Sequence, residues 1–68
     1  MPSNEYLLLN LRFNKMQKLL VLTTQIMQDY EAESNIYQLL SQSCKLYASE
    51  SIELKKQIDE LRLNEEYL

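Results

Sequence analysis

The chain has 68 residues, a formal net charge of −3, no glycine, no histidine, one proline and one cysteine. So short a chain rarely buries enough apolar surface to be stable alone, and one cysteine without histidine supplies neither an internal disulfide nor the ligands of a zinc site. The acidic balance argues against nucleic acid as a partner, because neutralising phosphates supplies much of the affinity there. We therefore expect stability to come from association between helices.

Residues 1–5 are predicted to form an N-terminal cap. Pro2 precedes two N-cap candidates, Ser3 and Asn4, and Glu5 follows where the positive end of a helix dipole favours an acid. The N-terminus lacks a basic leader followed by an uninterrupted apolar core, so we expect no secretory signal.

Residues 6–47 follow a seven-residue repeat (positions a to g) that can be drawn with a at Leu9 and d at Arg12, and every seventh residue after each. In the first part of this segment the apolar face spreads beyond a and d to residues such as Phe13 and Leu20. A wide face is typical of a helix covered on two sides. We expect residues 6–47 to form a bundle-forming helix.

Residues 48–68 are predicted to form a coiled-coil helix. Their apolar stripe narrows to Leu54, Ile58, Leu61 and Leu68, with charged residues between. Leucine at d and isoleucine at a favour a parallel two-stranded coiled coil. The stripe is still apolar at Leu68, so we also allow for a chain truncated at that residue.

The polar stretch from residue 29 to residue 35 leaves two alternatives open. Either one helix of about 95 Å, at 1.5 Å per residue, runs through it, or the chain turns there into a helical hairpin. The alanine and glutamates in the stretch have good helix propensity and no glycine marks a helix end, so the continuous helix is favoured. Asn35 tolerates the left-handed conformation better than most residues, which keeps the hairpin possible.

The predicted fold class is therefore all-α: a long helix that forms a coiled coil or helical bundle by oligomerisation, or else a hairpin with a turn near residues 29–35. Cys44 is expected to be a small buried hydrophobe in the apolar stripe; in a parallel, in-register dimer two copies of it would face each other. The residues expected in the interface are Leu9, Phe13, Met16, Leu19, Leu20, Ile26, Met27, Tyr30, Tyr37, Leu40, Cys44, Tyr47, Leu54, Ile58, Leu61 and Leu68.

The sequence predicts no enzyme and no catalytic, cofactor-binding or metal-binding residue. An extended helix offers no concave site, and without histidine there is no ready base near neutral pH. We expect a non-enzymatic oligomerisation and scaffold module that joins subunits of an intracellular complex, in the cytoplasm or nucleus, such as cytoskeletal or chromosome-segregation machinery. Its partner is expected to be the chain itself, another helical protein, or both.

Residues 6–27 support an alternative function. They are leucine-rich and carry Arg12, Lys15 and Lys18, as helices that lie in a membrane interface do. The alternative is a regulatory or membrane-tethering amphipathic helix. Apolar stripes more often face a protein core than a membrane, so the interaction module is favoured.

Overall fold

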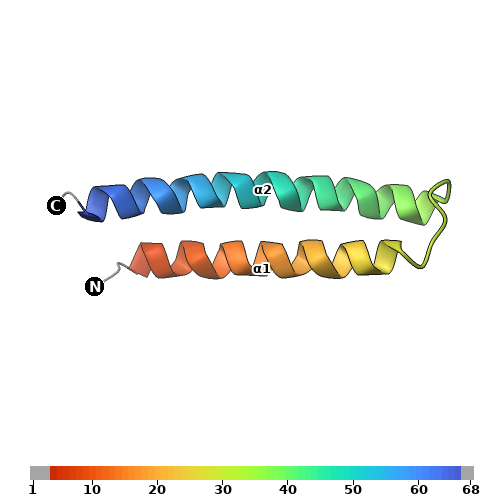
Figure 1. The fold of residues 1–68 in the computed structure, drawn as a ribbon, viewed down its shortest axis with the longest axis horizontal. Coiled ribbons are helices and arrows are strands. Elements are labelled where there is room, and N and C mark those ends of the chain that lie inside the picture. Colours follow the sequence, from red (N-terminus) through yellow and green to blue (C-terminus); the bar gives the residue numbers. More distant parts are fainter. Residues whose placement is uncertain (1–3, 67–68) are drawn as a thin grey trace.

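The chain folds back on itself as an antiparallel pair of helices. In the computed structural model, which describes the backbone of residues 4–66 and the side chains of residues 4–64, α1 spans Asn4–Met27 and α2 spans Asn35–Glu66. The two helices lie side by side, so the start of α1 and the end of α2 meet at one end and the connecting loop forms the other (Figure 1). The Cα atoms extend over 52 × 15 × 12 Å. The all-α prediction is confirmed, in its hairpin form.

The favoured prediction of one continuous helix is wrong. Residues 28–34 leave the helical path, and the amides of Asp29 and Tyr30 donate to the carbonyls of Ile26 and Met27, at 3.1 Å each. These bonds reach back three residues and tighten the last turn of α1, which satisfies carbonyl groups that a helix end leaves free. No described residue has a positive φ. The turn therefore forms without a glycine and without a left-handed Asn35.

The start of α2 is capped by a serine. The Ser34 hydroxyl accepts a hydrogen bond from the backbone N–H of Tyr37 at 3.1 Å and donates one to the carbonyl of Glu31 at 2.8 Å. The first helical bond follows, from the N–H of Gln38 to the carbonyl of Ser34 at 3.1 Å. A serine in this position satisfies a donor that the helix start would otherwise leave unpaired. Ser34 therefore marks the start of α2, although the chain has no glycine to mark the end of α1.

Packing explains why the chain turns rather than continues. In a single chain, a continuous helix would leave the apolar stripes of both halves in water, whereas burying one leucine or isoleucine contributes roughly 1.5–3 kcal/mol. Closing a short loop costs little in comparison, because closure entropy grows only with the logarithm of loop length. The hairpin also sets the basic first half of the chain beside its acidic second half, since residues 1–28 carry +2 and residues 29–68 carry −5.

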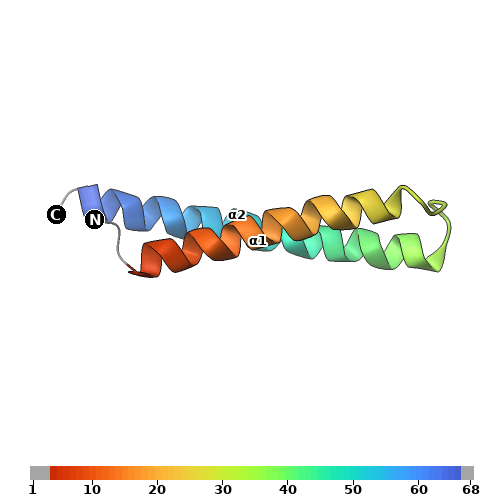
Figure 2. The same ribbon diagram turned by 90° about the horizontal axis from the view of Figure 1, so that it is seen from below.

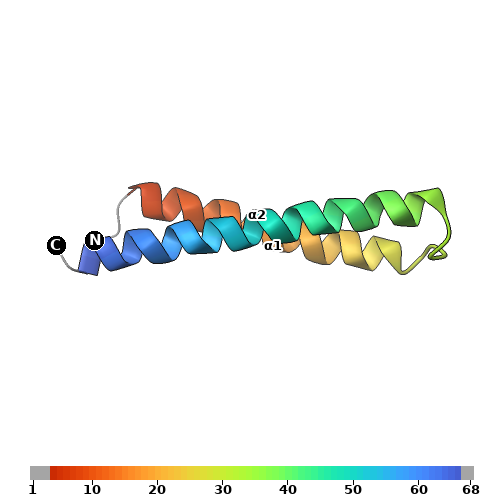
Figure 3. The ribbon, with the colours of Figure 1, turned by 90° about the horizontal axis from the view of Figure 1, so that it is seen from above.

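The four most buried side chains lie in one row of the predicted repeat. Leu9 is 8% exposed, Thr23 9%, Ser51 5% and Ile58 5%, and all four are a positions. Figures 2 and 3 show the two helices crossing at a shallow angle near their middle. A shallow crossing keeps a seven-residue repeat in contact along the whole pair.

Surface pockets that both helices line give the register of the pair. Leu9 lines a pocket with Gln57 and Leu61, and Met16 lines another with Glu50 and Leu54. Residues of α1 that are closer to the loop therefore lie beside residues of α2 that are also closer to the loop. Within the described residues, neither helix combines the length and the apolar character needed to cross a bilayer.

Candidate interaction surface

Most of the predicted interface residues contribute to the contact between the two helices. Leu9 and Ile58 are buried there, whereas Ile26 and Tyr30 are exposed, at 49% and 43%, and Leu68 lies outside the described residues. The predicted residues that are half-buried in the hairpin are Phe13, Met16, Leu19, Leu20, Met27, Tyr37, Leu40, Cys44, Tyr47, Leu54 and Leu61. Their contact with another chain stays a prediction.

Helix α1 covers most of its predicted interface residues within the hairpin, and Ile26 is the exception. Its most covered residues alternate three and four apart: Tyr6, Leu9, Phe13, Met16, Leu20, Thr23 and Met27. These are a and e positions, whereas Arg12 and Ile26 at d are exposed. The e row is apolar through three successive turns of the repeat, and the d row contains Arg12, which is costly to bury without a partner. In α2 the covered rows are a and d, as the sequence predicts.

The loop end of the contact contains small and sulfur-bearing side chains. The Cys44 thiol donates to the Met27 sulfur at 3.5 Å and lies 3.8 Å from the Thr24 hydroxyl. That hydroxyl also donates to the carbonyl of Leu20 at 2.8 Å. Cys44 is a free, half-buried thiol that faces α1 of its own chain. In the hairpin it therefore does not present its side chain to a second Cys44, as it would in the expected parallel pair.

Among the described residues, the hydroxyl oxygen of Ser51 is the one buried side-chain polar atom without a hydrogen-bond partner. It lies at the level of Met16, because the pocket that contains Met16 also contains its neighbours Glu50 and Leu54. An unpaired buried hydroxyl costs about 1–3 kcal/mol. The small side chain of Ser51 leaves room for Met16 between the two helices.

One broad face of the hairpin can be traced from a groove between the helices. Arg12 and Lys15 of α1 line this groove together with Glu50 and Glu53 of α2, so all four open on the same face. We call them the charged section. None of the four makes an ion pair within the described residues, where the pair found is Lys55–Asp59 at 3.2 Å.

The same face becomes apolar toward the loop. Seven residues make almost two turns, so residues seven apart on a helix point within about 20° of each other. One such step from the charged section toward the loop reaches Leu19 and Leu22 on α1, and Ser43 and Leu46 on α2. The next step reaches Ile26, Ile36 and Leu39.

Five of these residues form what we call the loop-end patch: Leu22, Ile26, Ile36, Leu39 and Leu46. Their exposed fractions are 54%, 49%, 48%, 64% and 66% in that order. Of these five residues, only Ile26 is among those predicted to lie in an interface. The signal that could have found Leu39 and Leu46 is their spacing, because they are seven residues apart at c positions of the repeat.

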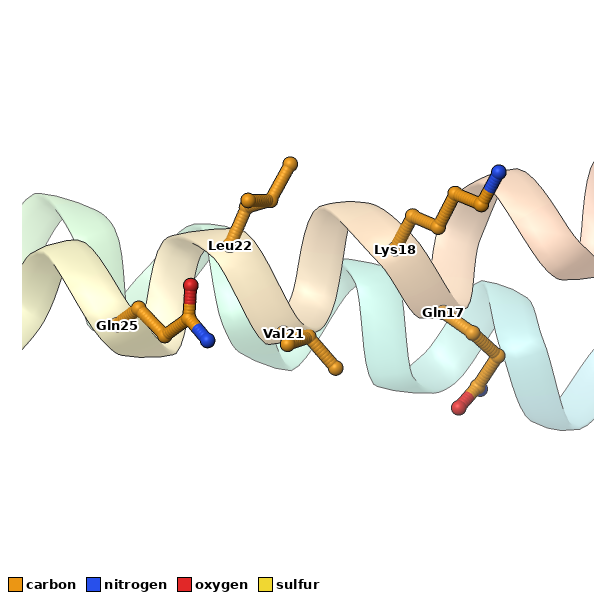
Figure 4. A pocket seen from close by; sticks show the side chains of 5 residues that line it. All are labelled: Gln17, Lys18, Val21, Leu22 and Gln25. Carbon is orange, nitrogen blue, oxygen red and sulfur yellow. The ribbon is translucent and has the colours of Figure 1, made fainter.

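The opposite broad face is mostly polar. Figure 4 shows that Leu22 and Lys18 leave α1 on one side, whereas Gln17 and Val21 leave it on the other. The rows on this second side, which we call the polar face, contain three exposed large apolar side chains, Leu7, Val21 and Ile52, of which Leu7 lies far from the loop. The other residues of these rows are Asn10, Asn14, Gln17, Thr24 and Gln28 on α1, and Gln38, Ser41, Lys45, Ala48, Lys55 and Asp59 on α2. The apolar surface of the loop half is therefore concentrated on one side.

Another apolar group lies near the start of α1, where Leu8 continues the row of Lys15 and Leu22 on the broad face. Leu7, Leu8 and Leu11 are 50%, 50% and 66% exposed, and the exposed cations Arg12 and Lys15 follow on the same helix.

No group of three or more metal-ligating side chains occurs in the described part of the chain. The exposed surface is therefore the feature from which function must be inferred, because comparisons with family models, with curated proteins and with solved structures give no match.

Proposed function

We propose that this protein is a non-enzymatic helical interaction module that joins subunits of an intracellular assembly in the cytoplasm or nucleus. Its partner is a second copy of the chain, another helical protein, or both. The observation that carries the proposal is the loop-end patch, in which five large apolar side chains are each about half exposed or more on one face.

Contiguous exposed apolar surface of this kind is typical of sites where proteins associate. A pair of helices is also only one layer of a domain, and a second layer on its apolar face completes a four-helix bundle. The polar face lacks such a surface, so association through the loop-end patch leaves the polar face in water. Burial of the patch supplies a driving force that an exposed ion pair such as Lys55–Asp59 does not, because exposed pairs contribute at most about 1 kcal/mol.

The composition of α1 supports the same proposal. Its covered rows are apolar, and Leu7, Leu11, Val21 and Leu22 are exposed on its other sides. A helix that is apolar on most sides is typical of one that is covered on most sides in its final assembly. The hairpin covers one side of α1 and leaves the rest for a partner.

Photo-crosslinking in cells of the source organism tests the proposal. A photoreactive amino acid in place of Leu46 lies in the loop-end patch, and the same group in place of Lys45 lies on the polar face one residue away. We expect discrete higher-mass adducts from position 46 and none from position 45. Absence of adducts from position 46, or equal adducts from both positions, would reject the interaction module.

The alternative function, membrane tethering, is favoured by one specific observation: exposed Leu7, Leu8 and Leu11 precede the cations Arg12 and Lys15. Apolar residues beside basic ones bind the interface of anionic membranes. Co-sedimentation with vesicles that contain phosphatidylserine tests it, with Leu11→Gln as the variant and Gln42→Ala as the matched control. Binding that Leu11→Gln abolishes and Gln42→Ala leaves intact supports tethering, and no binding rejects it.

A further inference from the structure

We propose that a second copy of this chain covers the loop-end patch, in a four-helix dimer whose two loops lie at the same end. The two-fold axis of this dimer runs parallel to the helices, above the broad face that carries the charged section and the patch. The inference rests on the proposed interaction module and names its partner and geometry.

The symmetry decides which residues meet. A two-fold axis along the hairpin places α1 of one copy over α2 of the other and keeps every residue at its own level along the axis. Residues of α1 and α2 that share a level within one hairpin therefore also face each other between the copies. The shared levels are known from the groove that Arg12, Lys15, Glu50 and Glu53 line together.

The charges are complementary in this arrangement. Arg12 and Lys15 of one copy lie opposite Glu50 and Glu53 of the other, and the symmetry repeats the match. Within the hairpin none of the four makes an ion pair, so all four are available to a partner. Exposed charge pairs of this kind contribute little affinity and chiefly select the orientation of the complex.

The apolar residues are complementary as well. Leu22 and Ile26 of one copy lie opposite Leu39 and Leu46 of the other, and again twice. In the free hairpin each of these side chains is about half exposed or more. Covering them removes the apolar surface that supplies most of the driving force for association.

The alternative two-fold dimer, with its axis across the hairpin and its loops at opposite ends, matches poorly. It sets α1 against α1 and α2 against α2 in opposite directions. Leu19 then meets Arg12, and Leu46 and Leu39 meet the acidic half of α2 that contains Glu53 and Glu60. Burying charged groups against leucine without partners is costly. The pairing of Arg12 and Lys15 with Glu50 and Glu53, which the loops-together dimer brings about and the alternative does not, therefore favours the arrangement with the loops together.

The size of the face is sufficient for a stable dimer. The Cα atoms behind this face extend over 52 by 15 Å, a rectangle of about 780 Å², and each partner buries roughly 800 Å² of accessible surface in specific complexes. The polar face has the same dimensions, but it lacks both the apolar patch and the matched charges.

Light scattering and mixed-cysteine cross-linking of the purified full chain test the inference. Light scattering should give twice the 8.1 kDa mass of one chain. For cross-linking, Cys44 is first replaced by serine. One chain then carries Leu22→Cys and a differently tagged chain carries Leu46→Cys; the two are unfolded, mixed and refolded. We expect a disulfide between the two tags. Leu22→Cys mixed with Leu8→Cys is the control, since those positions meet only when the loops lie at opposite ends.

A monomeric mass at every concentration would overturn the inference, as would cross-linking of Leu22→Cys to Leu8→Cys in place of Leu46→Cys. Failure of the inference and failure of the proposed function are distinguishable. If the purified chain is a monomer and position 46 forms adducts with a different protein in cells, the second copy is wrong and the interaction module stands. If position 46 forms no adduct at all, both are wrong.

Discussion

The Cys44 thiol of α2 lies 3.5 Å from the thioether sulfur of Met27, the last residue of α1. This contact joins two residues that are seventeen positions apart in the chain and closes the hairpin directly below its loop. Met27 is half-buried, and it lies in the e row with Phe13 and Leu20, which are half-buried as well. The contact therefore joins the end of α1 to α2 next to the turn.

Replacing Met27 with alanine should lower the free energy of unfolding by about 2 kcal/mol, the lower end for removing a methionine side chain from a contact, because Met27 is only half-buried. Urea unfolding followed by circular dichroism measures the change. The neighbouring exposed residue Gln28 supplies the control, and Gln28→Ala should change stability by less than about 0.5 kcal/mol. Equal effects of the two substitutions would contradict the contact.

Replacing Ser51 with alanine should raise the free energy of unfolding by about 1 kcal/mol, because the substitution removes a buried hydroxyl that has no partner while keeping nearly the same volume. Thermal unfolding at fixed chain concentration measures it. Ser49→Ala, at an exposed position two residues away, should leave the melting temperature almost unchanged. A loss of stability in Ser51→Ala would show that the hydroxyl has a partner after all.

Replacing Ser34 with alanine should lower the free energy of unfolding by about 1 kcal/mol, since it removes the cap on the amide of Tyr37. Ser34→Asp should retain most of the stability, because an aspartate also accepts a hydrogen bond at a helix start. Hydrogen exchange at the amides of Tyr37 and Gln38 localises the effect. Exchange that is unchanged in Ser34→Ala would mean that the cap does not hold the start of α2.

The sequence was sufficient to predict the all-helical fold and the covered face of α2, but not the break between the two helices. In α2 the charged residues outside the stripe leave one apolar face, so the repeat identifies Leu54, Ile58 and Leu61 without ambiguity. In α1 apolar residues occupy most rows, and no local rule decides whether the e row with Phe13 or the d row with Leu19 turns inward. The choice depends on how α2 packs against α1, and this packing is known only from the folded pair.

Helix propensity could not predict the turn. Propensity describes how well each residue suits a helix, whereas the turn depends on how much apolar surface the chain buries when it folds back. Glu31, Ala32 and Glu33 favour a helix locally, and the gain from folding back outweighs them. Ser34 was the available signal for a new helix start. The loop-end patch was missed for a related reason: the repeat was used to find one apolar face, and Leu39 and Leu46 belong to a second.

Reversing the charges of Arg12 and Lys15 to glutamate should weaken the proposed dimer by about tenfold or more, because four favourable pairs across the interface become four repulsive ones. Adding Glu50→Lys and Glu53→Lys to the same chain should restore the dimer, since both sides of every pair are then reversed. Sedimentation equilibrium at low ionic strength measures the dissociation constant, and circular dichroism confirms that each variant still forms the hairpin. Lys45→Glu with Lys56→Glu makes the same change in net charge away from the charged section and should leave dimerisation nearly unchanged. If the quadruple variant fails to recover, or if the control pair weakens the dimer equally, the charges do not select the orientation and the two loops need not lie at the same end.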